Sequence, residues 1–327
     1  MNVFGDIKVM FDFFKKKSFP IGIDMGDGVL KLAQLNKGIK GTRLVCGRSR
    51  PYPSLMRNGS LDWQKWAIET IHELISDGNF QGREVIAALP SSEVFIDLVK
   101  APKLKDAESI EEAVFAKVKQ KVPFESANVM TKCIPTEEEN ILFVATDREK
   151  INRYLAIYEN AHLQIKSICI WPMALARSYA TFFGRRASDA NSVVMLLDIE
   201  SNCTNIVICR HKNVLFARSV QIGLRDLKSS ELIDRLAIEL INCKRAFSLL
   251  YRNSNIDRLI FLSGFQYSGI EKETWTKLAK KLEMPAQIGD CLAAVEVHVK
   301  DGAGCIERRG CEFSWAAAFG LSLLQGN

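Results

Sequence analysis

Two short acidic turns are the part of this sequence whose residue types and spacing could do chemistry. The first occupies residues 24–28 and begins with Asp24, and the second occupies residues 198–202 and begins with Asp198. Each follows an apolar run typical of a buried strand, so each places a carboxylate where a strand ends. Such a carboxylate can hold a metal ion while the backbone N–H groups of the turn bind phosphate. One turn of this kind is common, but two that face each other would bind a nucleoside triphosphate from both sides.

The residue types of the two turns suggest separate roles. We expect Asp24 and Asp198 to hold a magnesium ion through water. Lys31, in the strand after the first turn, either approaches phosphate or lies on the surface, because its alternation along the strand allows both. The other turn residues that could contact the nucleotide are Gly26, Asp27, Gly28, Glu200, Ser201, Asn202 and Thr204.

Composition limits the class of protein. The chain has 327 residues, of which 47% are hydrophobic and 25% charged, which is enough for about two domains with their own cores. The nine cysteines are scattered without a Cys-x-x-Cys pair, as in a reducing compartment. A net charge of +6 is spread along the chain without any nucleic-acid-binding motif, so we expect no nucleic-acid partner. No apolar run is long enough for a signal peptide or a membrane span, and we expect a cytoplasmic protein.

The first 19 residues form a separate amphipathic segment. Apolar residues at Val3, Ile7, Met10 and Phe14 share one face of a helix that ends in three lysines, 15–17. This helix could lie on an anionic membrane, dock a partner, or pack on the protein itself.

The remaining pattern alternates strands and helices, which predicts an α/β fold. A hairpin follows residue 29, a helix covers residues 62–76, and a buried strand covers 84–89. A compact β-α-β-β insertion follows, with a strand at 94–99, a helix at 107–121 and strands at 129–134 and 141–145. We expect the acidic loop at 137–140 to be a solvated turn. The main body continues with a helix at 147–160, a strand at 164–170, a long helix at 230–251 and a strand at 258–262.

The duplicated acidic turn resembles that of the actin-like ATPase superfamily, and further motifs resemble the PilM family of type IV pilus assembly proteins, which is similar to the cytoplasmic part of GspL. These motifs lie at residues 22–26, 88–90, 100–102, 121–124, 171–176, 216–223, 262–264 and 316–321. The resemblance implies an actin-like, ribonuclease H-like fold of two domains. The first would cover residues 20–186 with the insert at 91–146, the second would cover 187–312, and a final helix at 313–327 would return to the first domain.

The same resemblance implies further nucleotide contacts and shows three departures. Glu239 and Lys244 would border the sugar and base, with Ser263, Gly264 and Phe265 on the adenosine side. However, Asp27 stands where the family has a hydroxyl, Glu200 where it has a glycine, and Phe265 where a second glycine is expected. A side chain at Glu200 blocks close approach of a phosphate, and an added carboxylate repels it.

Magnesium-ATP is therefore a candidate cofactor whose binding these departures weaken. Alternatively, Glu200 and Asp27 supply oxygen ligands to the metal. The sequence identifies no residue that orients an attacking water, so we assign no catalytic residue and leave hydrolysis open.

The resemblance implies a cytoplasmic scaffold at the inner face of the inner membrane, in a type IV pilus or related secretion complex. Its expected partners are a peptide of a PilN-like membrane protein and the cytoplasmic motor ATPase, with membrane association through these partners or the N-terminal helix. The peptide groove would involve residues from about 85 to 99. Two alternatives are an active ATPase that forms nucleotide-controlled filaments and a membrane tether resembling FtsA.

Overall fold

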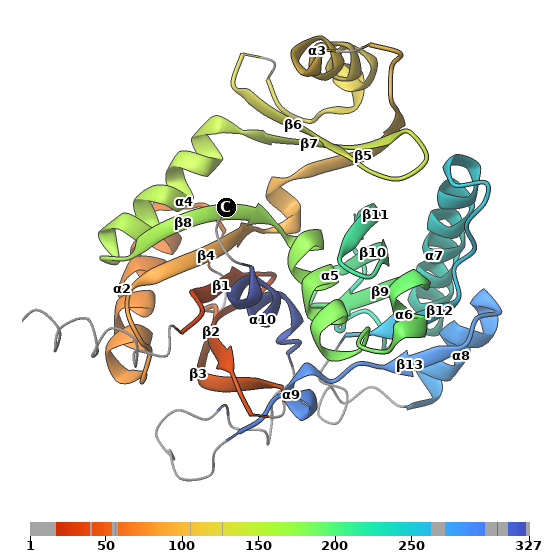
Figure 1. Ribbon diagram of the computed structural model, residues 1–327. Helices are drawn as coiled ribbons and strands as arrows, with labels where there is room; N and C mark the ends of the chain where they lie inside the picture. The colour runs from red at the N-terminus through yellow and green to blue at the C-terminus, as the bar shows by residue number, and fades with distance from the viewer. Residues whose placement is uncertain are drawn as a thin grey trace, which may run out of the picture.

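Two five-stranded sheets with the same topology form the body of the protein (Figure 1). The computed structural model describes residues 18–39, 41–53, 56, 58–104, 106–125, 127–262, 272–297, 306 and 313–324. The first sheet has the order β3-β2-β1-β4-β8, and the second has the order β11-β10-β9-β12-β13. The strands of the first are β1 (Ile21–Met25), β2 (Val29–Lys37), β3 (Thr42–Pro51), β4 (Glu84–Leu89) and β8 (Gln164–Ile170). Those of the second are β9 (Val193–Ile199), β10 (Thr204–Arg210), β11 (Asn213–Val220), β12 (Arg258–Phe261) and β13 (Ala286–Ile288).

In each sheet an antiparallel three-stranded meander is followed by two parallel strands. Parallel neighbours need crossover connections, and helices supply them. These are α2 (Leu61–Asp77) and α4 (Arg148–Asn160) in the first half, and α7 (Ser230–Leu250) and α8 (Lys272–Leu282) in the second. Because β1 and β9 hold equivalent central places, the acidic turns that follow them lie at equivalent edges of the two sheets.

Helix α2 shows how the sequence sets these elements. The hydroxyl of Ser60 accepts a hydrogen bond from the backbone N–H of Trp63 at 3.2 Å, which caps the first turn. Trp63, Ala67, Ile71 and Leu74 are buried at helical spacing against the first sheet. The predicted helix at 62–76 is confirmed to within one residue at each end.

Two helices fill the layer between the sheets, α5 (Trp171–Phe182) and α10 (Ala316–Leu323). One apolar core joins them to both sheets, whereas α2 with α4 and α7 with α8 cover the outer faces. Every residue of α10 is buried. At Gly320 a Cβ atom would lie 1.9 Å from the carbonyl oxygen of Ala174, so the two helices cross at a distance that requires glycine.

The insertion is a separate small sheet of order β5-β7-β6 covered by one helix. Its elements are η1 (Ser91–Glu93), β5 (Phe95–Lys100), α3 (Ala107–Val118), η2 (Lys119–Lys121), β6 (Val129–Pro135) and β7 (Asn140–Asp147). The predicted β-α-β-β order is confirmed. Two short helices, α6 (Ala187–Asn191) and α9 (Cys291–Ala294), complete the described elements.

The predicted amphipathic helix falls on residues 1–17, which lie outside the described part of the chain. Among the described residues, none of the helices is both long and apolar enough to cross a lipid bilayer.

Candidate functional site

The two acidic turns lie against each other and are joined by hydrogen bonds. The backbone N–H of Asp27 donates to the carboxylate of Glu200. In return, the backbone N–H of Asn202 donates to Oδ2 of Asp27 at 2.5 Å, and its side-chain amide donates to Oδ1 at 2.9 Å. The structure thus brings together the residues predicted from the two turns, but as partners of one another.

Glu200 occupies the space above the first turn. A Cβ atom placed on Gly26 would lie 2.9 Å from each carboxylate oxygen of Glu200, and one on Gly28 would lie 3.3 Å from Oγ of Ser201. Gly28 has a φ of +90°, a conformation that favours glycine. Glycine lets another group approach the backbone of the first turn closely, and side chains of the second turn occupy that position.

A third segment holds the second turn in place. The backbone N–H groups of Leu224 and Arg225 donate to the carbonyl oxygens of Glu200 and Ser201 at 2.8 and 3.1 Å. The Arg225 guanidinium also donates to the side-chain oxygen of Asn202 at 3.1 Å. Sequence reasoning missed Arg225, because a single arginine in a loop carries no local signal of its partner.

Below the turns lies a buried group of charges. Asp24 on β1 and Lys31 on β2 are cross-strand partners in the antiparallel register, and their charged groups are 2.8 Å apart. The Lys31 ammonium also donates to the backbone carbonyl of Ser314 at 2.9 Å. The position of Lys31, which the sequence left open, is therefore the interior beside the carboxylates; its side chain is 4% exposed.

Burial and neighbouring charges shift the pKa values of this group. Burial raises the pKa of Asp198 to about 6 and that of Glu200 to about 8, although the charge of Lys31 opposes both shifts. Burial by itself lowers the pKa of Lys31, but Asp24, Glu200 and Asp198 outweigh it and raise that pKa above its ordinary value. The lysine therefore stays charged and serves as the counter-ion of the carboxylates.

Little space is left between the turns. The cavity there, lined by Lys31, Glu200, Leu224 and Phe313 among others, has a volume of about 10 Å³. That is room for about one water molecule, whereas ligand pockets usually measure 300–1,000 Å³. As the described residues stand, the space between the two turns therefore does not fit the phosphates of a nucleoside triphosphate.

The described residues near the turns also do not suit the predicted magnesium ion. The charge that a magnesium ion would supply beside Asp24 is supplied by Lys31. The alternative ligands come closer together, since Asp27, Glu200 and Cys203 have ligand atoms within 4.8 Å of one another. However, Asp27 and Glu200 already accept hydrogen bonds from the opposite turn, and burial raises the pKa of the Cys203 thiol. The described residues around the turns therefore do not fit a metal ion.

The side chains of the other predicted site residues have partners outside the two turns. Thr204 is buried and its hydroxyl donates to the carbonyl of Ile222 at 2.6 Å. Glu239 forms an ion pair with Arg218 at 3.3 Å. Lys244 donates to the carbonyl of Leu282 at 3.3 Å. It lies in the second half of α7, toward the edge of the second sheet that is opposite the acidic turns. Ser263, Gly264 and Phe265 lie outside the described residues.

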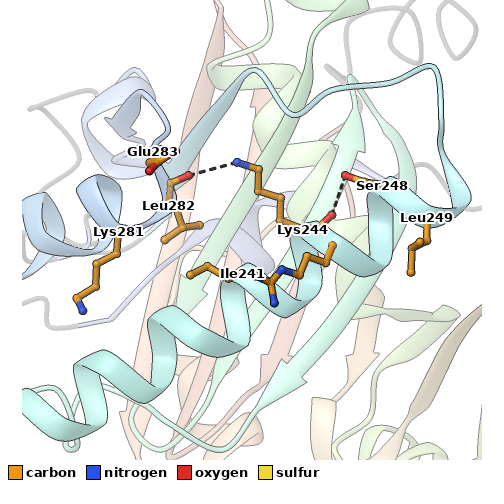
Figure 2. A pocket seen from close by; sticks show the side chains of 8 residues that line it. Ile241, Lys244, Ser248, Leu249, Lys281, Leu282 and Glu283 are labelled. Carbon is orange, nitrogen blue, oxygen red and sulfur yellow. Dashed lines mark hydrogen bonds between the residues drawn. The ribbon is translucent and has the colours of Figure 1, made fainter.

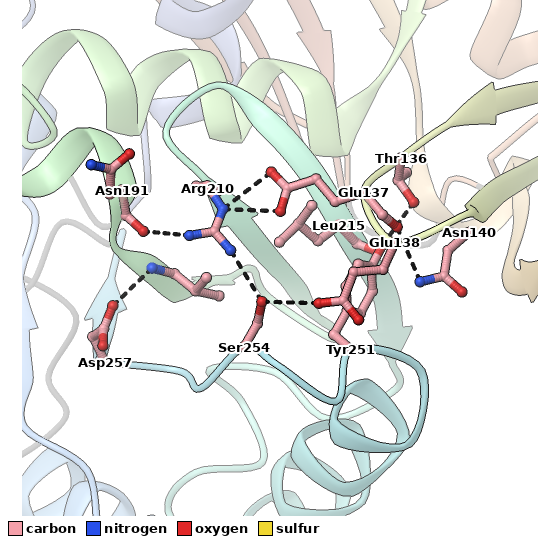
Figure 3. Close-up of polar contacts among 11 residues, drawn as sticks. Thr136, Glu137, Glu138, Asn140, Asn191, Arg210, Leu215, Tyr251, Ser254 and Asp257 are labelled. Atoms are coloured by element: carbon pink, nitrogen blue, oxygen red, sulfur yellow. Dashed lines mark hydrogen bonds and ion pairs between the residues drawn. The ribbon is translucent and has the colours of Figure 1, made fainter.

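The tip of the inserted sheet contacts the second sheet (Figure 3). Nε of Arg210, at the end of β10, donates to both carboxylate oxygens of Glu137 at 2.9 and 3.1 Å. Ser254 links the same guanidinium to Glu138, through bonds of 3.1 and 3.4 Å. The prediction of a solvated acidic turn at 137–140 is therefore wrong, because its partner Arg210 lies far away in the sequence.

Strand β5 lies where the hydrophobic cores of the first sheet, the central layer and the second sheet meet. Val94, just before it, packs on the core of the first sheet, Ile96 on the central core and Leu98 on the core of the second sheet. Ser91 Oγ accepts a hydrogen bond from Ser219 Oγ on β11 at 3.2 Å. In the predicted peptide groove, the β4 residues 85–89 are buried, so only the part from Pro90 to Leu98 is partly exposed.

Comparison with known proteins agrees with this architecture. The family profile of the type IV pilus assembly protein PilM matches residues 22–240. Among solved structures, the PilM-PilN type IV pilus biogenesis complex aligns with a TM-score of 0.71 and 21% identity, covering 93% of this chain and 97% of the other. A Bacteroides thetaiotaomicron protein with an actin-like ATPase fold and unknown function aligns with a TM-score of 0.50 and 12% identity over 89% and 97% of the two chains. Comparison with curated protein sequences gave no significant match. The predicted actin-like fold is confirmed.

Proposed function

This chain belongs to the PilM family of type IV pilus assembly proteins, and from that premise we propose that it is a scaffold whose nucleotide cleft has become an internal contact. The observation that carries the proposal is the pair of acidic turns. Asp27, Glu200 and Asn202 bind one another where a nucleotide phosphate would have to lie. The departures from the family pattern at Asp27 and Glu200 are the groups that make this contact.

We further propose that the protein binds the cytoplasmic tail of a PilN-like membrane protein. Support comes from the similarity of the fold to the PilM of a PilM-PilN complex. The partly exposed apolar side chains around β5, at the junction of the insert with both sheets, offer a surface for an extended peptide. Binding there would hold the protein at the cytoplasmic face of the inner membrane, where it would connect to the pilus motor ATPase.

Calorimetric titration with magnesium-ATP tests the cleft. We expect no binding heat for the wild type and measurable binding for the double variant Asp27→Ser/Glu200→Gly, which removes both carboxylates and restores the small residues. Thermal unfolding of the variant checks that it folds. Micromolar binding by the wild type would contradict the proposal and favour the active ATPase.

Hydrogen exchange with a synthetic peptide of the PilN-like tail tests the partner. We expect slower exchange in residues 90–98 when the peptide is present. A peptide that does not bind, or that protects a different surface, would overturn this assignment without affecting the conclusion about the cleft.

A further inference from the structure

The outer face of α7 carries exposed apolar side chains. Ile238 is 57% exposed and Leu249 is 76% exposed. With Ile241 and Arg245 they stand at spacings of three and four residues, so the four share one side of the helix. A single exposed apolar residue is ordinary, but two large ones on one stripe are less so. At 1.5 Å per residue the stripe is about 17 Å long.

A groove runs beside this stripe, between the second half of α7 and the end of α8 (Figure 2). Its volume is about 690 Å³, far larger than the cavity between the acidic turns. Ile241, Leu249 and Leu282 supply its apolar lining. The strand directions of the second sheet place this end of α7 toward the sheet edge opposite the acidic turns. The groove is therefore separate from the acidic turns.

The charges of the groove are mainly positive. Lys244, Arg245 and Lys281 line it together with a single carboxylate, Glu283. Lys244 donates to a backbone carbonyl, and Lys281 lies 3.3 Å from Asp234. Within the described part of the chain, the guanidinium of Arg245 has no hydrogen bond or ion pair, although it stands in the middle of the apolar stripe.

We propose that this groove binds an acidic amphipathic helix of another protein. The apolar face of such a helix would cover Ile238, Ile241 and Leu249, and its carboxylates would pair with Arg245 and Lys244. The stripe has the length of about three helical turns, which suits a helix better than a small molecule. A membrane is disfavoured because a flat lipid surface does not enter a groove that lies between two helices.

A phage-displayed library tests the charge preference directly with the full chain. Each member is a 14-residue helix with leucines fixed along one face and Glu, Lys or Ser allowed at the flanking positions. We expect selection to enrich Glu-rich members, and Arg245→Glu to lower their affinity at least tenfold, as measured by fluorescence anisotropy. Exchanging Glu for Lys in the selected peptide should restore binding to Arg245→Glu, which a folding defect could not explain.

Two variants serve as controls. Arg83→Glu changes the charge of an exposed arginine in the first half of the protein, and Leu61→Ser removes a leucine at the start of α2 that is 81% exposed. Both should bind the selected peptides like the wild type, whereas Leu249→Ser should not.

Several results would overturn the proposal. They are failure to enrich any member, enrichment of neutral or basic members, or equal binding by Arg245→Glu. Sedimentation with phosphatidylglycerol vesicles that is lost in Leu249→Ser would assign the groove to lipid instead. Self-association of the wild type that is lost in the same variant would assign it to a second copy of the chain.

Discussion

Replacing Lys31 with methionine removes the cation beside three carboxyl groups while keeping an unbranched side chain of similar length. The ammonium is 2.8 Å from the carboxylate of Asp24 and also opposes the charges of Asp198 and Glu200. At this distance and an effective dielectric of 20, the Asp24 attraction alone is about 6 kcal/mol before desolvation is counted. Loss of one member of a buried ion pair usually costs 3–5 kcal/mol, because the other charge stays buried without a partner. We expect a loss of about 4 kcal/mol in the free energy of unfolding at pH 7.5.

The loss should shrink at lower pH. Without Lys31, the carboxyl groups bind protons more readily in the folded state, so the variant gains stability relative to the wild type as the pH falls. Urea unfolding at pH 7.5 and 5.5, followed by circular dichroism, measures both effects. We expect the difference between variant and wild type to be at least about 1 kcal/mol smaller at pH 5.5.

Two further variants make the result decisive. Lys37→Met changes an exposed lysine on the same strand and should leave the unfolding free energy within about 0.5 kcal/mol of the wild type. Lys31→Met/Asp24→Asn removes both charges and should recover much of the loss, even if the single variant does not fold. Equal stability of Lys31→Met and wild type, or a difference that does not depend on pH, would refute the role of Lys31 as counter-ion.

Three other predictions concern the insert, the carboxyl groups and the central layer. Arg210→Met should lower the unfolding free energy by about 1–2 kcal/mol by breaking its bonds to Glu137, with Arg252→Met as an exposed control; equal losses in both would contradict this. Because the pKa of Glu200 is raised to about 8, the folded state holds a proton that the unfolded state releases, so wild-type stability should fall as pH rises from 5 to 8, by up to about 1.4 kcal/mol per pH unit. Urea unfolding across that range measures the slope, and a flat or rising curve would exclude it. Gly22→Ala should cost about 3 kcal/mol by chemical denaturation, since the new Cβ would lie 2.1 Å from the carbonyl oxygen of Ala318; a near-neutral effect would show that α10 can shift.

Local patterns were enough to predict most helices and strands of this fold. The capped, amphipathic sequence of α2 and the apolar strand before each acidic turn carry their own signals. The two turns were also recognised as a pair. What sequence could not predict was that Asp27 and Asn202, 175 residues apart, would bind each other.

Long-range partners explain the other differences. Eight of the nine residues of β2 are buried, so alternation could not tell on which face Lys31 would lie. The acidic loop was assigned to solvent because three consecutive glutamates usually are solvated. Glu138 and Glu139 have φ values of 54° and 55°, unusual for glutamate in a tight turn. The contacts with Arg210 and Ser254 hold the loop in this conformation, and no residue near the loop in the sequence indicates these contacts.

The burial of α10 has a consequence for how the protein is made. This helix follows all the other described elements in the chain, so it is the last of them to leave the ribosome. Until it does, β1, α5 and the inner faces of both sheets lack the apolar surface on which they pack. The two halves can form their outer layers before α10 has been made, but the central layer can close only once α10 has emerged. Nascent chains that still lack α10 should therefore expose this apolar surface to chaperones.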